Sequence, residues 1–139
     1  YHITTEGVKR KNFLMITYFQ ELIDVYFLVG QSMEFFFRDL ENRGIEKVLL
    51  YGAGKVAETI LMVISGRTNK PLKVLAIIDD DPDLLGKDIQ GYKIISKNQI
   101  PNYPHDSIII TSYTYEDTIM KKLTDIKYPN EKIERLFTI

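Results

Sequence analysis

The sequence predicts an α/β fold in which an open, mostly parallel sheet carries helices on both faces. Three short runs, Lys47–Tyr51, Val74–Ile78 and Ser107–Thr111, are almost entirely apolar. Segments with apolar residues at helical spacing follow the first and the third of these runs. A strand that is apolar on both faces needs cover on both faces, and helices crossing between parallel strands provide it.

Each element of this fold follows from its own pattern. The helix after the first run carries Val56, Ile60 and Ile64 on one face, and the helix after the third run has the same apolar spacing. Two shorter apolar segments, around Tyr92–Ile95 and over Ile133–Thr138, are expected to add strands. Parallel strands joined through helices make right-handed crossovers, so the domain over 45–139 should form one open sheet.

A long helix is expected before this domain, over 11–43. Residues 5–42 contain no proline, and apolar residues recur at alternating intervals of three and four, as in a coiled-coil seam. The seam comprises Ile16, Phe19, Ile23, Tyr26, Met33, Phe37 and Leu40, with Gly30 as a gap. Because glycine weakens a helix interior by about 1 kcal/mol relative to alanine, Gly30 marks a place for a kink.

Two interpretations of this helix stay open. A second apolar stripe runs beside the seam at intervals of seven and consists of Met15, Leu22, Val29 and Phe36. A single helix cannot bury two stripes against itself, so its partner is either the domain that follows or a second copy of the chain. We favour the second copy, which predicts a homodimer formed through residues 16–40.

Composition excludes several kinds of function. Eighteen basic against nineteen acidic residues leave a net charge of −1, so the chain as a whole lacks a polycationic surface for nucleic acid. The absence of cysteine rules out disulfides, thiolate-bound metals and thiol catalysis. Only two histidines, His2 and His105, are present, and they stand far apart, so no metal is expected.

The chain shows no sign of a membrane segment. Its most apolar stretch, Phe13–Val29, is interrupted by one amide and two carboxylates, whereas a membrane span needs about 20 residues with few or no charges. We therefore expect a cytoplasmic protein without membrane insertion. The sequence starts at Tyr1 without a methionine or a leader, which favours a piece of a longer protein.

A glycine pattern between the first strand and the first helix, Gly52-x-Gly54-x-x-Ala57, predicts a phosphate-binding loop of the dinucleotide type. Gly52 allows a sharp turn, Gly54 leaves room for a diphosphate, and Ala57 lets the helix pack closely. Main-chain amides and the helix dipole would then hold the anion. The predicted phosphate-binding residues are Gly52, Ala53, Gly54, Lys55 and Val56. A tight turn without a ligand is the alternative.

Polar residues at the ends of the second and third strands complete the predicted site. Asp79 lies 25 residues after Gly54, where an acid accepts hydrogen bonds from ribose hydroxyls and repels a 2′-phosphate. Asp80 is kept as a candidate beside it, although a turn role suits it better. Thr111 and Ser112 follow the third strand, at the edge where open α/β sheets bind ligands. Capping of the next helix is the alternative role for Ser112.

The span from Lys47 to Thr111 resembles the Rossmann-like nucleotide-binding domain at the front of polysaccharide-biosynthesis dehydratases and epimerases and of related sugar acetyltransferases, a group similar to CoA-binding domains. The motifs that carry this resemblance are Val48–Gly54, Ala76–Pro82, Gly86, Gly91–Ile95 and Ser107–Thr111. It implies that NAD, a UDP-sugar or a related nucleotide binds at Gly52, Gly54 and Asp79. Lys55 departs from the family, which has a small residue after the second glycine.

The first residues resemble the end of a winged-helix DNA-binding domain of the multiple-antibiotic-resistance regulator (MarR) type. Tyr1-His-Ile-Thr-Thr-Glu-Gly7, followed by Lys11, carries this resemblance. It implies that residues 1–10 are the remnant of such a domain and that a dimer helix follows. Contact with DNA would then be made only through the missing N-terminal domain.

Two functions from different classes fit these features. The first is the nucleotide-sensing and dimerisation region of a transcription regulator linked to polysaccharide or sugar-nucleotide metabolism. The second is the nucleotide-binding portion of a sugar-nucleotide epimerase or dehydratase without its catalytic domain. No catalytic set is recognised. Tyr51 and Lys55 have the spacing of a short-chain dehydrogenase pair, but they straddle the glycine loop and so cannot lie on one helical face, and His105 lacks a carboxylate partner. This favours the regulator; a domain used only for association is a third reading.

Overall fold

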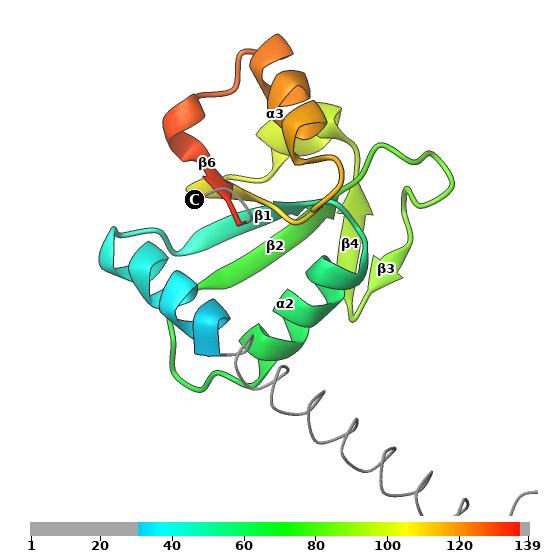
Figure 1. The fold of residues 1–139 in the computed structure, drawn as a ribbon. Coiled ribbons are helices and arrows are strands. Elements are labelled where there is room, and N and C mark those ends of the chain that lie inside the picture. Colours follow the sequence, from blue (N-terminus) through cyan, green and yellow to red (C-terminus); the bar gives the residue numbers. More distant parts are fainter. Residues whose placement is uncertain (1–30, 137–139) are drawn as a thin grey trace, which may run out of the picture. The chain divides into compact units, whose positions relative to one another are not determined.

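The computed structural model describes residues 31–136, which fold into a layered α/β arrangement (Figure 1). The chain divides into two compact units, 1–36 and 37–139, and the second holds the whole sheet. A helix over 31–42 comes first. The elements that follow are β1 (Lys47–Tyr51), α2 (Lys55–Ser65), β2 (Lys73–Ile78), β3 (Asp88–Ile89), β4 (Tyr92–Ile95), η1 (Lys97–Asn102), β5 (Ser107–Ile110), α3 (Glu116–Asp125), η2 (Asn130–Lys132) and β6 (Ile133–Arg135).

The strands of residues 31–136 form one sheet in the order β3-β4-β2-β1-β5-β6. Every neighbouring pair is parallel except β3 and β4, which form an antiparallel hairpin. The chain runs outward from β1 on one side and then returns to β1 to build the other side with β5 and β6. The prediction of an open, mostly parallel α/β sheet is therefore confirmed, and its strand order reverses at β1, where such sheets bind ligands.

Helices cover both faces of this sheet: α3 lies on one face and α2 on the other (Figure 1). On the α3 side, alternate residues of the central strands meet Ile119 and Leu123 in one buried cluster. On the other side α2 buries Ala57, Ile60 and Leu61. Both faces of β1, β2 and β5 are buried, which explains why these strands read as continuous apolar runs.

The hairpin of β3 and β4 adds a strand that the sequence pattern does not predict. Gln90 and Gly91 connect the two strands with φ angles of +50° and +86°. Positive φ at both central residues of a two-residue loop is typical of a type I′ turn. Only Asp88 and Ile89 form β3, which is too short for an apolar run or an alternating pattern to predict it.

The end of the helix over 31–42 belongs to the same compact unit as the sheet. Phe37 and Leu40 are fully buried within the chain, so these two positions are removed from the predicted dimer seam. The guanidinium of Arg67 lies 5.3 Å from the centre of the Phe37 ring and 2.6 Å from Oε1 of Glu41. The remaining seam positions before residue 31, with Gly30, lie outside the described residues.

The Glu41 carboxylate ties the end of this helix, residues 37–42, to two other segments of the sheet unit. Arg67, which follows α2, donates to both Glu41 oxygens, and the amide of Leu72, just before β2, donates to Oε2 at 3.0 Å. Both side chains of the ion pair are almost fully buried, at 10% exposed for Glu41 and 6% for Arg67. The helix end is thus held by the residues that flank α2 and β2.

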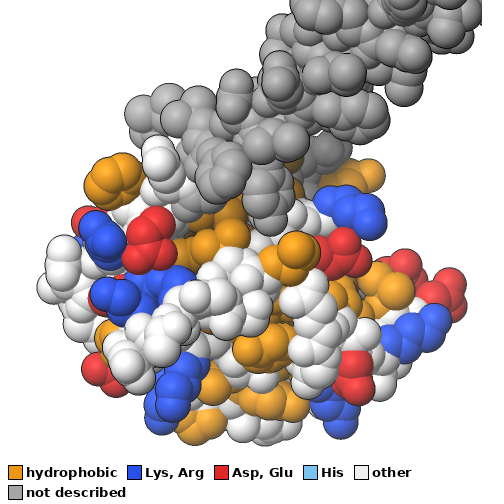
Figure 2. Space-filling view, turned by 90° about the horizontal axis from the view of Figure 1, so that it is seen from below, with side chains coloured by type: hydrophobic (Ala, Val, Ile, Leu, Met, Phe, Trp, Pro, Cys, Tyr) orange, Lys and Arg blue, Asp and Glu red, His pale blue; other side chains and the backbone are white. Residues whose placement is uncertain are grey.

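The surface of the described residues is mixed in character. On the face seen in Figure 2, basic and acidic side chains lie interspersed, and neither sign gathers into a broad patch. Within residues 31–136, no helix combines the length and the apolar character needed to cross a membrane.

Candidate functional site

The turn after β1 depends on Gly52. Its φ angle is +120°, and a Cβ built there would lie 3.1 Å from Oγ1 of Thr111 and 3.4 Å from Cβ of Ser112. Its amide donates to the carbonyl of Ile78 at 2.8 Å, which joins the end of β1 to the end of β2. A side chain at this position would be strained and crowded, so glycine is required by the protein's own packing.

Gly54 is in the opposite situation. It caps the N-terminus of α2 in an extended conformation with φ −115°, and no atom lies within 4 Å of the place where a Cβ would stand. Neither the backbone nor the packing of the described chain requires glycine here. The missing side chain leaves open space directly above the start of the helix.

The amides around Gly54 are available to a ligand. In the described part of the chain, the N–H groups of Gly54, Lys55 and Val56 donate no hydrogen bond, and no side chain caps the helix. The first N–H groups of a helix point along the positive end of its dipole and favour an anion. The geometry at α2 therefore suits a phosphate or diphosphate.

Asp79 lies opposite this helix start and is bound to the glycine loop. Its Oδ2 accepts a hydrogen bond from the amide of Ala53 at 2.8 Å, and its Oδ1 accepts one from the amide of Asp81 at 2.9 Å. The predicted donor at Ala53 is thus engaged within the chain, because the carboxylate at the end of β2 faces the loop. Each carboxylate oxygen keeps a second lone pair that can accept from a ligand hydroxyl.

The carboxylate of Asp80 accepts hydrogen bonds from two side chains, Tyr51 and Lys122. The hydroxyl of Tyr51 lies 2.9 and 3.0 Å from its oxygens, and Nζ of Lys122 lies 2.7 Å from Oδ2. Burial opposes ionisation of Asp80, but the hydrogen bonds from Lys122 and Tyr51 outweigh it, so its pKa is lowered. Burial, with the nearby Asp80 charge, raises the pKa of Tyr51 far above its usual value, so Tyr51 stays protonated.

Thr111 and Ser112 hold the loops of the site in place. The Thr111 hydroxyl, which is buried, lies 2.6 Å from the carbonyl oxygen of Gly52 and 3.0 Å from that of Tyr51. The Ser112 hydroxyl accepts from the amide of Tyr115 at 3.1 Å, just before α3. This bond lies in the turn before α3, whose N-cap is Tyr115 and whose N-terminus has no side-chain cap, so Ser112 does not cap the helix. Contact of Thr111 or Ser112 with a ligand stays a prediction.

Two adjoining pockets lie at this edge of the sheet. The glycine cleft has a volume of about 380 Å³ and is lined by Gly52, Ala53, Gly54, Lys55, Val56, Asp79, Thr111, Ser112, Tyr113, Thr114 and Tyr115. It brings together all the predicted site residues except Asp80. The helix pocket has a volume of about 270 Å³ and is lined by Tyr51, Gly52, Asp79, Asp80, Ser112, Tyr115, Thr118, Ile119 and Lys122.

The residues that sequence reasoning did not assign to the site come mainly from α3 and the turn before it. Tyr115 lines both pockets, and Thr118 and Lys122 line the helix pocket. Their only signal in the sequence is that they follow the third apolar run, whose carboxyl end meets the glycine loop. Among residues 31–136, no group of three or more histidine, cysteine or acidic side chains could hold a metal ion.

His105 is hydrogen-bonded to residues outside the two pockets. Its Nδ1 lies 2.6 Å from the carbonyl oxygen of Tyr103, which can only accept, so Nδ1 carries the proton. Nε2 lies 2.8 Å from the hydroxyl oxygen of Tyr128. Burial raises the pKa of Tyr128 to about 12. His105 lines neither pocket described above.

The family comparison covers the whole of this arrangement. The family model described as C2185-like, N-terminal, matches residues 44–134, which contain the glycine loop, Asp79 and α3. The chain belongs to the C2185-like, N-terminal family. No curated protein matches the chain. The match leaves out residues 1–43, so neither the winged-helix resemblance nor the predicted dimer helix of this C2185-like chain is covered by it.

Solved structures share the fold of the C2185-like chain. RSP, a Rex-family repressor, is 15% identical with a TM-score of 0.51, over 98% of this chain and 88% of RSP. The complex of RSP with beta-NADH is 15% identical with a TM-score of 0.50, over 98% and 89%. UDP-D-quinovosamine 4-dehydrogenase from Vibrio fischeri is 23% identical with a TM-score of 0.49, over 66% and 75%. The likeness to RSP shows a Rossmann-like fold.

Proposed function

We propose that this chain is the nucleotide-sensing and dimerisation region of a transcription regulator linked to polysaccharide or sugar-nucleotide metabolism. Its ligand would be NAD or a UDP-sugar. The observation that carries the proposal is the glycine cleft. There, three unengaged amides lie at the start of α2, and the space where a Gly54 side chain would stand is open. A nucleoside diphosphate supplies both the anion for these amides and the hydroxyls for Asp79.

Two features favour a sensor over an enzyme. In the described part of the chain, three ionisable side chains of the helix pocket are engaged with one another: Asp80 binds Lys122 and Tyr51, and Tyr51 stays protonated. No nucleophile paired with a base is found among the lining residues of either pocket. RSP, which shares this fold, is described as a Rex-family repressor and has been crystallised with beta-NADH.

In this proposal each segment of the chain has its own role. Residues 1–10 end a winged-helix domain that contacts DNA, and residues 45–139 bind the nucleotide. Residues 11–43 form the dimerisation helix, whose pairing positions lie before Phe37. The mixed charge of the face in Figure 2 agrees with DNA contact being made elsewhere. Such a regulator acts in the cytoplasm beside the DNA. An upstream helix-turn-helix region in the full reading frame supports the regulator, whereas a downstream catalytic domain supports the sugar-nucleotide enzyme.

The first prediction tests the glycine cleft. Gly54→Glu is expected to raise the Kd of NADH or UDP-glucose at least about 100-fold, because the new carboxylate enters the open space and repels the diphosphate. The fold should survive, since the backbone of Gly54 suits any residue and no neighbour lies within 4 Å of the new Cβ. Isothermal titration calorimetry on the purified chain measures the change in Kd.

Ser65→Glu is the matched control for this prediction, because it adds the same charge to the exposed far end of α2. The control should keep the Kd of the unmutated chain within about threefold. Binding of neither ligand to the unmutated chain, or equal Kd values for Gly54→Glu and Ser65→Glu, would remove the proposed function.

The second prediction concerns association through the N-terminal segment. The heptad seam before residue 31 contains Ile23, and Ile23→Asp is expected to convert a dimer into a monomer because a charge is buried in an apolar seam. Size-exclusion chromatography with light scattering gives the mass. Gln20→Asp, which lies off both apolar stripes, should leave the dimer intact. A monomeric unmutated chain, or a dimeric Ile23→Asp chain, would contradict this part of the proposal.

A further inference from the structure

The helix pocket has no part in the proposed function as argued so far, although it opens directly from the glycine cleft. The two share Gly52, Asp79, Ser112 and Tyr115 in their walls. A molecule whose diphosphate lies on the glycine loop and whose ribose diol reaches Asp79 therefore arrives at the entrance of the helix pocket. The third part of a nucleotide, its planar base, is what remains to be placed.

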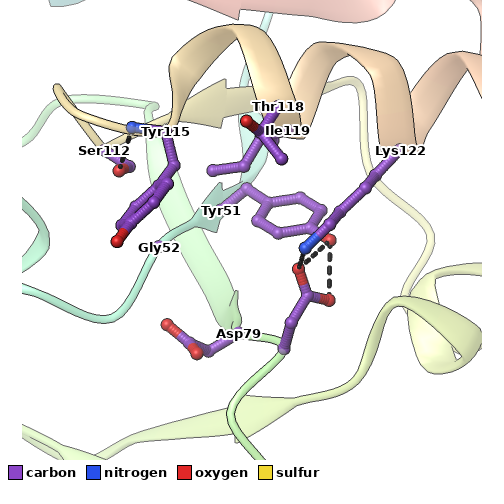
Figure 3. A pocket seen from close by; sticks show the side chains of 9 residues that line it. Tyr51, Gly52, Asp79, Ser112, Tyr115, Thr118, Ile119 and Lys122 are labelled. Carbon is purple, nitrogen blue, oxygen red and sulfur yellow. Dashed lines mark hydrogen bonds and ion pairs between the residues drawn. The ribbon is translucent and has the colours of Figure 1, made fainter.

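We propose that the helix pocket binds the base of the nucleotide and that Tyr115 is the residue on which the base stacks. This inference rests on the proposed function. Figure 3 shows the ring of Tyr115 along one side of the pocket, with Ile119 of α3 above and the ring of Tyr51 opposite. Tyr115 is 63% exposed as a residue in the described structure, whereas Tyr51 and Ile119 are almost fully buried. A flat apolar ring would cover the exposed face of Tyr115.

The charges in the helix pocket favour a neutral ring over a further phosphate. Lys122 Nζ lies 2.7 Å from Asp80, so its positive charge is already compensated. Asp79 adds a negative charge at the entrance and would repel a phosphate beyond the ribose. Thr118 also lines the helix pocket, and its hydroxyl is a group that can hydrogen-bond the edge of a base.

Stacking of a base on an aromatic side chain changes affinity by about 10-fold to 100-fold when the ring is removed. Tyr115→Ala is therefore expected to raise the Kd of ADP and UDP by that factor. The Kd of inorganic pyrophosphate, which has no base, should stay within about threefold of that for the unmutated chain. Tyr115→Phe keeps the ring and should restore nucleotide binding. All Kd values are measured by calorimetry on the full chain.

Met62→Ala is the matched control, because Met62 is 52% exposed on α2 and lines neither pocket. It should leave all three Kd values unchanged. The inference is overturned if Tyr115→Ala binds ADP and UDP as tightly as the unmutated chain does, or if both bind no more tightly than pyrophosphate.

The two proposals fail in different ways. Nucleotide binding that survives Gly54→Glu but is lost in Tyr115→Ala would contradict the proposed phosphate site in the glycine cleft and support the base site in the helix pocket. Loss of nucleotide binding in Gly54→Glu with no effect of Tyr115→Ala would do the reverse. An unmutated chain that binds neither pyrophosphate nor nucleotides would overturn both.

Discussion

Gly52→Ala is expected to lower the free energy of unfolding by about 4 kcal/mol. A φ of +120° costs an alanine about 1–3 kcal/mol, and forcing a Cβ to 3.1 Å from Oγ1 of Thr111 adds about 1–3 kcal/mol. Thr111 cannot move aside, because its buried hydroxyl is held at the carbonyls of Gly52 and Tyr51. Thermal unfolding should show a Tm lower by roughly 10 °C or more.

Gly54→Ala is the natural comparison for this variant, because it places the same methyl group two residues away without strain. Its free energy of unfolding should fall by no more than about 1 kcal/mol, the cost of a poorer N-cap residue. Equal stabilities of the two alanine variants would contradict the structural role assigned to Gly52. Urea unfolding of both chains beside the unmutated one measures the difference.

Arg67→Met is expected to lower the free energy of unfolding at pH 7 by about 3–5 kcal/mol, because it leaves the Glu41 carboxylate buried without its cation. Burial opposes ionisation of Glu41, but the hydrogen bonds from Arg67 and Leu72 outweigh it and lower its pKa below the ordinary 4.5. A lowered pKa stabilises the folded chain above the ordinary value and loses this contribution as the pH falls through the folded value. Without Arg67 the pKa of Glu41 should rise instead.

The loss of unfolding free energy in Arg67→Met should therefore become smaller as the pH falls toward 5, because the Glu41 carboxyl can then protonate. Adding Glu41→Gln to Arg67→Met should recover part of the stability at pH 7, since no buried charge remains. Lys55→Met breaks an exposed ion pair with Glu58 and should change stability by less than about 1 kcal/mol. Urea unfolding at pH 7 and pH 5 tests all of these; an Arg67→Met chain as stable as Lys55→Met would contradict the prediction.

Much of the fold could be predicted because burial on two faces leaves a direct record in the sequence. The strands β1, β2 and β5 are apolar after their first residues, and the residues at or just after their carboxyl ends line the glycine cleft. Parallel strands bring their carboxyl ends to one edge, so Gly52, Asp79 and Thr111 converge without any further information. The hairpin strand β3 was not predictable, since its two residues, Asp88 and Ile89, are placed by a turn and not by burial.

The parts of the site that sequence reasoning missed depend on partners distant in the chain. No sequence pattern predicts that Asp80 forms an ion pair with Lys122 of α3, or that Asp79 accepts a hydrogen bond from the amide of Ala53. The heptad pattern had a similar limit, because an apolar seam shows that a helix needs cover without saying which chain supplies it. The structure answers this for Phe37, which is buried beneath Arg67 of the same chain.

The two edge strands of the sheet limit the pairing of this sheet with strands of another molecule. In the described residues, β3 has two residues and β6 has three, and they form the outermost strands. Two side chains of β6 are already engaged, Glu134 with Arg43 and Arg135 with Glu116. Edge strands this short offer another molecule few main-chain groups for pairing, which disfavours edge-to-edge growth of the sheet into fibres.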